Sequence, residues 1–378
     1  MSAAERALSG APHRILTLDG GGVRGALSVE ILARIEEIVR GQGAETLSDY
    51  FDYIAGTSSG AILATCLSLG WPVERVRRFY ETRAEEMFDK ASLLRRLHHL
   101  YDADPLRELL REEIGREDDG GEVTLGSARL RTLLMLVMRN ATTDSPWPIS
   151  NNPQARYNAP DRLHSNLDIP LWQLVRASTA APVYFPPEQV DVGARRFLFV
   201  DGGITCYNNP SFHTFLMATS EPYRLCWPTG EKALLLVSVG TGTNPMANAG
   251  LAPGDMNLLY NASTVPSALM FAAQNEQDLL CRTFGRCLAG APIDREVGDM
   301  CEANGSACAG PTPDKLFTYV RYNADLSAGG LAALGLGDVE PARVQKLDAV
   351  DGIPDLQRVG RALAGRDVRE AHFAGFAP

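Results

Sequence analysis

Residues 56–60 have the sequence Gly-Thr-Ser-Ser-Gly and fit the pattern Gly-x-Ser-x-Gly, with Ser58 at the central position. In this pattern small residues let the chain turn sharply from a strand into a helix, which exposes the central serine oxygen as a nucleophile. An apolar segment at residues 51–55 precedes the motif, and another at residues 61–69 follows it with helical spacing. These flanking segments favour a nucleophilic serine over the alternative, a glycine- and serine-rich helix cap.

A second motif, residues 19–25 (DGGGVRG), lies between a strand-like segment at residues 14–18 and a helical segment at residues 26–39. Glycines leave their backbone N–H groups uncovered, so the three consecutive glycines of this motif can approach a negatively charged oxygen closely. Arg24 would hold the loop in place or add positive charge. The motif therefore predicts an oxyanion hole.

The same loop also fits Gly-x-Gly-x-x-Gly through Gly20, Gly22 and Gly25, a pattern of dinucleotide-binding proteins. Such proteins place an acidic residue at the end of the second strand, about twenty residues further on. Glu45 and Asp49 lie near that distance, but both precede the second strand instead of ending it. We favour the oxyanion hole and keep a nucleotide-binding protein, either a Rossmann-like oxidoreductase or a regulator, as the alternative.

Asp201, Gly202 and Gly203 follow an apolar strand predicted at residues 197–200. In open α/β sheets, ligand-binding and catalytic groups gather at the carboxyl ends of strands. A carboxylate in this position can take the proton of Ser58 as a general base. An isolated Asp-Gly-Gly is more often a simple turn, but the two motifs described above favour the general base.

None of the six histidines of the sequence lies in a recognisable catalytic motif. A Ser-Asp-His order along the chain would leave His213 or His372 as the base. Both are explained more simply as surface or packing residues. The sequence therefore predicts a two-residue site, Ser58 with Asp201, in preference to a triad.

The 378-residue chain has 36 Lys and Arg against 46 Asp and Glu, a net charge of −10. This charge argues against nucleic-acid polymers as partners, because phosphate binding needs a basic surface. Contact with an anionic membrane would have to be local and apolar.

The longest apolar runs, residues 132–138 and 233–239, are far shorter than the roughly 20 residues of a membrane span. With no apolar leader at its start, the sequence predicts a cytoplasmic protein that is at most peripheral on a membrane.

The seven cysteines are an odd number, which predicts reduced thiols and no disulfide framework. Cys281, Cys287, Cys301 and Cys308 follow one another at intervals of six, fourteen and seven residues. These intervals differ from the short Cys-x-x-Cys pairs of structural zinc sites. We expect neither a metal nor a cofactor.

Strand-like and helical segments alternate along the chain, which predicts an α/β fold with a mainly parallel sheet covered by helices on both faces. Residues 73–114 are predicted to be mostly helical and residues 142–166 to be a long surface loop. A long helix is expected near residues 263–288, and a further strand at residues 316–322.

Four motifs together resemble those of the patatin-like phospholipase family, in the same order: DGGGVRG (19–25), GTSSG (56–60), RASTAAPVYFPP (176–187) and DGGITCYNNP (201–210). The resemblance covers about the first 240 residues. It implies a three-layer α/β/α patatin-like fold with a mainly parallel central sheet. The implied parts are a tail at residues 1–13, a catalytic core at residues 14–243 and a C-terminal part at residues 244–378, packed on the core with lid, dimer or regulatory elements.

The resemblance also implies the roles of individual residues. Ser58 would be the nucleophile and Asp201 its partner in a Ser-Asp dyad. The oxyanion hole would be formed by Gly20, Gly21, Gly22 and Arg24, and the motifs would be supported by Gly25, Gly56, Gly60, Gly202 and Gly203. Residues 180–187 supply small and aromatic side chains, either for an acyl pocket or for a packed turn.

The implied activity is that of a serine lipid acyl hydrolase, a phospholipase A or lysophospholipase that acts on lipid or phospholipid at a membrane surface. Some bacterial members of the family are effectors switched on by cyclic nucleotides. The resemblance therefore adds a small-molecule activator such as a cyclic nucleotide, and a homo-oligomer, to the partners to be tested. An exposed apolar lip, controlled by the loop at residues 142–166 or by the region after residue 244, would make the contact with lipid.

Overall fold

The computed structural model of the chain describes residues 3–10, 12–87, 103–159, 164–245, 250–294, 296–301 and 314–378. The strands are β1 (His13–Leu18), β2 (Tyr53–Thr57), β3 (Leu133–Asn140), β4 (Ser145–Ser150), β5 (Glu188–Val192), β6 (Arg195–Asp201), β7 (Leu234–Val239), β8 (Arg286–Ala289) and β9 (Thr318–Tyr322). The helices are α1 (Ala3–Ala7), α2 (Gly25–Gly41), α3 (Leu47–Tyr50), α4 (Ser59–Ser68), α5 (Val73–Met87), α6 (Asp104–Ile114), α7 (Leu171–Ser178), α8 (Ser211–Thr219), α9 (Leu258–Phe284), α10 (Ala328–Ala333), α11 (Pro341–Val344) and α12 (Ile353–Asp367).

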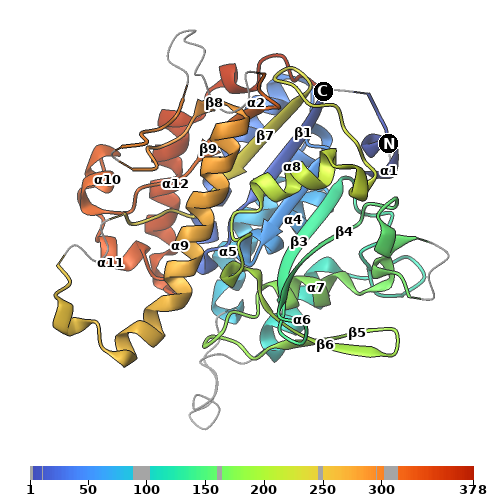
Figure 1. Ribbon diagram of the computed structural model, residues 1–378, viewed down its shortest axis with the longest axis horizontal. Coiled ribbons are helices and arrows are strands. Elements are labelled where there is room, and N and C mark those ends of the chain that lie inside the picture. The colour runs from blue at the N-terminus through green and yellow to red at the C-terminus, as the bar shows by residue number, and fades with distance from the viewer. Residues whose placement is uncertain are drawn as a thin grey trace.

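In the described residues all nine strands join one sheet in the order β5-β6-β3-β2-β1-β7-β9-β8, with β4 paired to β3 (Figure 1). The five pairs at the centre and on the β8 side are parallel. The three pairs that β4, β5 and β6 make are antiparallel. The sheet is therefore mixed and mainly parallel, as the alternation of strands and helices predicts.

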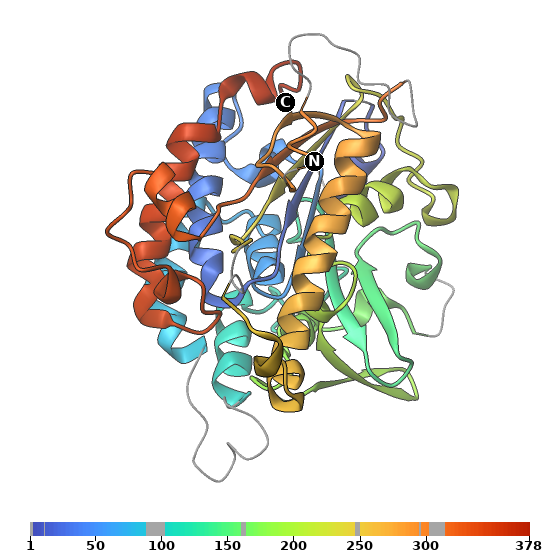
Figure 2. The ribbon, with the colours of Figure 1, turned by 60° about the vertical axis from the view of Figure 1, so that its left-hand side comes forward.

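Alternate residues of the central strands pack on opposite faces of the sheet, as the two-residue period of a strand requires. In β3, for example, Leu134 and Leu136 belong to one buried apolar cluster, whereas Met135 and Val137 belong to another. Helices α2, α4, α5, α6, α7 and α12 contribute to the first cluster, and α1, α8 and α9 to the second. Figure 2 shows the resulting layers, with α2 and α12 on one side of the sheet and α9 on the other. The predicted three-layer α/β/α fold is confirmed.

The parallel neighbours β1, β2 and β3 bring the motifs of the sequence to one edge of the sheet. Leu18 of β1 lies beside Gly56 of β2, and Thr57 of β2 lies beside Val137 of β3. The glycine loop therefore follows β1 at the same edge at which Ser58 follows β2.

Strand β6 runs antiparallel to β3, yet its last residue reaches the same edge. The two strands overlap only at the carboxyl end of β3, where Asp201 pairs with Met138. Since Val137 pairs with Thr57, the register places Asp201 next to Ser58. The short overlap thus lets an antiparallel strand deliver a residue to the edge formed by parallel strands.

The prediction of a long loop at residues 142–166 was wrong in its first part, because residues 145–150 form β4. Pro146 and Pro148 obscure this strand in the sequence, since proline removes a backbone donor. Prolines are tolerated here because β4 pairs only with β3 and lies at an edge. Strand β5 also has no counterpart in the prediction; it forms an antiparallel hairpin with β6.

The long helix predicted at residues 263–288 corresponds to α9, which begins earlier and ends at Phe284. Gly285 follows it, and residues 286–289 form β8, parallel to β9. The middle of the predicted helical region at residues 73–114 lies outside the described residues, and so does Cys308. Among the helices that the structure describes, none combines the length and apolar character needed to cross a bilayer.

Candidate active site

Ser58 occupies a sharp turn between β2 and α4. Its backbone has φ 56° and ψ −125°, in the region of positive φ that a residue with a side chain seldom adopts. The neighbouring Gly60 has no space for a side chain, because a Cβ atom there would overlap the carbonyl oxygen of Leu18 in β1. The N–H of Ser58 donates to Ser178 Oγ at 3.0 Å. This is the strained strand-to-helix turn that the Gly-x-Ser-x-Gly pattern predicts.

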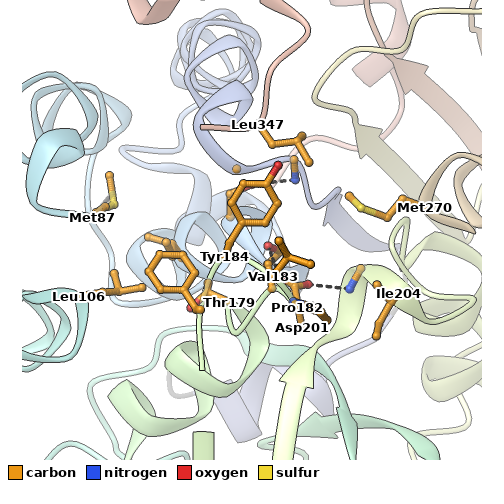
Figure 3. Close-up of a pocket in the computed structure, with 18 of the residues that line it drawn as sticks. Met87, Leu106, Thr179, Pro182, Val183, Tyr184, Asp201, Ile204, Met270 and Leu347 are labelled. Carbon is orange, nitrogen blue, oxygen red and sulfur yellow. Dashed lines mark hydrogen bonds between the residues drawn. The ribbon is translucent and has the colours of Figure 1, made fainter. Parts of the chain in front are cut away.

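Asp201 lies beside Ser58, and the two side chains share a short hydrogen bond. Ser58 Oγ donates to Asp201 Oδ2 at 2.5 Å, and the other carboxylate oxygen accepts the N–H of Gly203 at 2.7 Å (Figure 3). Ser58 is 8% exposed and Asp201 is 4% exposed. The carboxylate is therefore held in one orientation against the serine hydroxyl, away from bulk water.

Burial raises the pKa of the Asp201 carboxyl to about 6, because the charged form loses its hydration. Hydrogen bonds from Ser58 and Gly203, and the positive charge of Arg176, oppose part of this rise. Arg176 is itself fully buried, and its Nη2 donates to the carbonyl oxygen of Pro186 at 3.0 Å. The result is a carboxylate that is ionised at neutral pH and more basic than an exposed aspartate.

The glycine loop that follows β1 faces the N-terminus of α4. Gly22 has φ +59°, and a Cβ atom there would overlap the carbonyl oxygen of Leu347, so glycine is required. The N–H of Gly20 donates to the carbonyl oxygen of Asn208 at 3.1 Å, and that of Gly21 donates to Ser59 Oγ at 3.0 Å.

Two further N–H groups at this loop, those of Gly22 and Ser59, bear on the predicted oxyanion hole. Among the hydrogen bonds of the described residues, none uses the N–H of Gly22 or the N–H of Ser59. Both residues line the cavity that contains Ser58. These two groups are thus available to a ligand in the cavity, and Ser59 is a donor that the sequence analysis did not name.

Arg24 follows the glycine loop at the start of α2. Burial lowers the pKa of its guanidinium to about 10, and the nearby carboxylate of Asp19 opposes this shift. Arg24 remains charged at neutral pH. Its Nε atom is buried and makes no hydrogen bond to the residues that the structure describes.

Asp19, the residue before the glycines, makes a buried ion pair that the sequence analysis missed. Arg321 of β9 donates through Nη1 and Nη2 to the two carboxylate oxygens, at 2.8 and 2.5 Å. Gln274 of α9 also donates to Asp19, from Nε2 at 3.1 Å. Both partners lie more than 250 residues further along the chain, in a part of the sequence without a recognisable motif, so only the fold reveals them.

A cavity of about 350 Å³ opens beside Ser58 and Asp201. Met87, Leu106 and Ile62 line it, together with residues of the segment 179–185. Figure 3 shows Met87 and Leu106 on one side of this space and Met270 and Leu347 on the other. Of the two uses predicted for residues 180–187, a wall of a pocket is therefore the one that the structure shows. Asp201 is the only charged residue among the described residues that line the cavity.

The two histidines considered as an alternative base have other partners. His213 stacks on Tyr207 with ring centroids 4.2 Å apart, and burial lowers its pKa to about 4. His372 Nδ1 forms a hydrogen bond with the hydroxyl of Tyr322 at 2.8 Å. The hydrogen-bond partner of Ser58 Oγ is Asp201.

The acidic residues considered for a dinucleotide site do not end a strand. Asp49 accepts the N–H of Thr46 at 2.9 Å and closes the first turn of the short helix α3. Strand β2 ends at Thr57, directly before Ser58. The arrangement at this edge therefore favours the oxyanion interpretation of the glycine loop.

Comparison with known proteins agrees with this geometry. Residues 16–214, just over half of the chain, match the family model described as patatin-like phospholipase. The chain belongs to the patatin-like phospholipase family. Gln274 and Arg321, which hold Asp19, lie outside the residues that match the family model. In this patatin-like phospholipase family member the glycine loop is thus held in part by residues beyond the matched region.

Several named proteins are similar to this family member. A protein named cGAMP-activated phospholipase, from Vibrio cholerae, is 32% identical over 216 residues, which are 53% of this chain and 56% of that protein. One of the same name from Escherichia coli is 30% identical over 238 residues, 60% of this chain and 62% of that protein. Patatin-2-Kuras 1 from Solanum tuberosum is 26% identical over 333 residues, 77% of this chain and 82% of that protein. The match thus spans less than two thirds of the length of the two bacterial relatives.

The buried pair predicts a large loss of stability when one partner is removed. Arg321→Ala would leave Asp19 as an uncompensated buried charge, which lowers the free energy of unfolding by about 3–5 kcal/mol. Urea unfolding followed by circular dichroism measures this change. Arg196→Ala, which breaks the exposed pair with Asp191, is the matched control and should leave the midpoint nearly unchanged. Equal small effects of both variants would contradict the structural role of Arg321.

Proposed function

We propose that the protein is a serine lipid acyl hydrolase in which Ser58 and Asp201 form a catalytic dyad. The observation that carries this proposal is the 2.5 Å hydrogen bond from Ser58 Oγ to Asp201 Oδ2 at the wall of an apolar cavity. The family, and relatives named as phospholipases, support an ester-linked lipid as the substrate.

In the proposed reaction Ser58 Oγ attacks the ester carbonyl carbon while Asp201 takes the hydroxyl proton. The carbonyl oxygen becomes an oxyanion that accepts the N–H groups of Gly22 and Ser59, at the positive end of the α4 dipole. Of the three glycines of the loop, Gly22 is the principal donor, because the N–H groups of Gly20 and Gly21 already bind Asn208 and Ser59.

The tetrahedral intermediate then collapses, and Asp201 returns the proton to the leaving alcohol. The acyl group stays on Ser58 until water, deprotonated by Asp201, attacks the acyl carbon. The second tetrahedral intermediate then releases the fatty acid while Asp201 returns this proton to Ser58 Oγ. One carboxylate thus performs both proton transfers. Its raised pKa suits this use, since a base works best with a pKa close to the working pH.

The cavity beside Ser58 fits the acyl chain. Its walls are mainly apolar side chains, and apart from Asp201 none of its described lining residues carries a charge. Each methylene transferred from water to such surroundings contributes about 0.8 kcal/mol. A fatty acyl chain therefore gains most from this space, which supports a lipid over a short or charged ester.

We further propose that a cyclic dinucleotide regulates the enzyme, because two relatives carry the name cGAMP-activated phospholipase. Gln274 connects α9 to Asp19, so a ligand that displaces α9 would also displace the glycine loop. This link gives a physical route from a site outside the active centre to the oxyanion donors.

The first test is loss of the nucleophile and of the base. Ser58→Ala and Asp201→Asn should each lower fatty-acid release from mixed phospholipid liposomes by about a thousandfold or more. Ser58→Ala should also abolish covalent labelling by a fluorophosphonate. Ser9→Ala and Asp191→Asn, at exposed positions, are the matched controls, and circular dichroism checks the fold. Substantial turnover by either purified dyad variant would disprove the dyad.

The pH dependence follows from the raised pKa of Asp201. The base acts when deprotonated, so kcat/KM should fall about tenfold per pH unit below the pKa of about 6 and level off above it. The measurement uses a soluble ester and a pH-independent assay of the released alcohol. A profile that stays flat from pH 7 to pH 5, with the protein folded throughout, would contradict Asp201 as the base.

Regulation is tested with the compound that the relatives' names give. Adding cGAMP to the purified protein should raise the initial rate of fatty-acid release by about 5- to 100-fold, the usual span of allosteric coupling. An equimolar mixture of AMP and GMP is the control and should not change the rate. Equal rates with cGAMP and with the control mixture would remove the activator from the proposal.

A further inference from the structure

A second cavity, of about 730 Å³, adjoins the cavity that contains Ser58. Ser267 and Met270 of α9, together with Leu347, line both spaces, so we call the first the inner cavity and the second the outer cavity. In Figure 3 Met270 and Leu347 lie across the inner cavity from Met87 and Leu106. The inner cavity thus has a far end at Met87 and a junction with the outer cavity at Met270.

One face of α9 lines the outer cavity. Thr264, Ser267, Phe271 and Gln274 recur at intervals of three or four residues, as a single helix face requires, and all belong to the lining. Val265 and Phe271 are apolar, yet 50% and 39% of their surfaces are exposed. Apolar surface left open beside a cavity is typical of a site that an apolar ligand covers.

The outer cavity contains little charge. Among its described lining residues Arg24 alone is charged, and it lies at the start of α2 next to the glycine loop. The other polar groups are neutral hydroxyls and amides, such as those of Thr243, Asn244 and Gln345. A largely apolar site with one cation suits a ligand that combines hydrocarbon with a single negative charge.

The position of the junction identifies what this ligand is. With the ester carbonyl at Ser58 and the cleaved acyl chain against Met87 and Leu106, the rest of the lipid can pass Met270 and Leu347, where the two cavities adjoin. In a diacyl phospholipid that remainder consists of the glycerol, one phosphodiester and the second acyl chain. These parts match the single cation and the apolar lining of the outer cavity.

We propose that the outer cavity binds the second acyl chain and the glycerophosphate of a diacyl phospholipid, and that Met270 and Leu347 form the passage between the two chain sites. This inference rests on the proposed hydrolase function. It makes the enzyme prefer diacyl over monoacyl phospholipids, because only the former fill both cavities. A cyclic dinucleotide is the competing occupant, but its two phosphates match a single cation and exposed apolar side chains less well.

Two variants test the outer cavity without touching the dyad. Met270→Trp narrows the passage, and Val265→Asp places a charge among residues that line only the outer cavity. Leu279→Trp and Leu279→Asp are the matched controls, because Leu279 is an exposed residue of the same helix that lines neither cavity. The substrates are phosphatidylcholine and lysophosphatidylcholine with the same cleavable chain, presented in the same detergent micelles.

The measured quantity is the ratio of kcat/KM for the diacyl lipid to that for the monoacyl lipid. Excluding two or three methylenes from an apolar site costs about a factor of ten or more in affinity, so both test variants should lower the ratio by about that factor. Both Leu279 variants should keep the wild-type ratio. An unchanged ratio in Met270→Trp and Val265→Asp would overturn the inference. It would also be overturned if these two variants changed only the concentration of cGAMP needed for activation.

A binding measurement separates failure of this inference from failure of the proposed function. Ser58→Ala protein should bind a diether phosphatidylcholine, which has no cleavable ester, and adding Val265→Asp should weaken that binding about tenfold. If the wild type cleaves neither lipid, both with and without cGAMP, the hydrolase proposal fails. The other outcome is that both lipids are cleaved, but Ser58→Ala binds the diether lipid equally well with and without the added Val265→Asp. The hydrolase proposal would then stand, and a site for the second acyl chain in the outer cavity would be excluded.

Discussion

The buried ion pair between Asp19 and Arg321 joins two segments that are 302 residues apart in the sequence, at the edge of the sheet where the glycine loop begins. Asp19 lies between the last residue of β1 and the glycines of the loop. Arg321 lies on β9, which pairs with β7, and β7 in turn pairs with β1. A carboxylate buried to this degree is stable only with a fully bonded cation. The position of the loop therefore depends on β9, and through Gln274 also on α9.

Given that support, the register of the strands determines the rest of the site. Ser58 keeps an unfavourable backbone conformation because β2 and α4 fix it from both sides, and its N–H and Oγ are both hydrogen bonded. The short antiparallel overlap of β6 with β3 brings Asp201 to the same edge. The sheet fixes the positions of both residues. The distance between Ser58 Oγ and the Asp201 carboxylate therefore depends on the register of the strands.

The sequence was sufficient to predict the fold class and the residues of the candidate dyad, because these depend on local patterns. The turn at Ser58 needs small residues between an apolar strand and an apolar helix, and all three parts are visible within the nineteen residues 51–69. The roles of Arg321 and Gln274 could not be predicted, because an arginine and a glutamine far from any motif give no local signal. Strand β4 was not predicted for another reason. Its prolines are typical of a loop, and they are tolerated in this strand only because it lies at an edge of the sheet.

The apolar cavity and the chemistry of Asp201 constrain each other. The apolar surroundings in which we propose that an acyl chain binds also remove water from the carboxylate and raise its pKa, which makes it a stronger base. Three interactions oppose part of this rise by stabilising the ionised form. They are the hydrogen bonds from the Ser58 hydroxyl and the Gly203 N–H, and the positive charge of the buried Arg176. In the proposed reaction a filled cavity would exclude still more water, so substrate binding itself would make Asp201 a stronger base when Ser58 loses its proton.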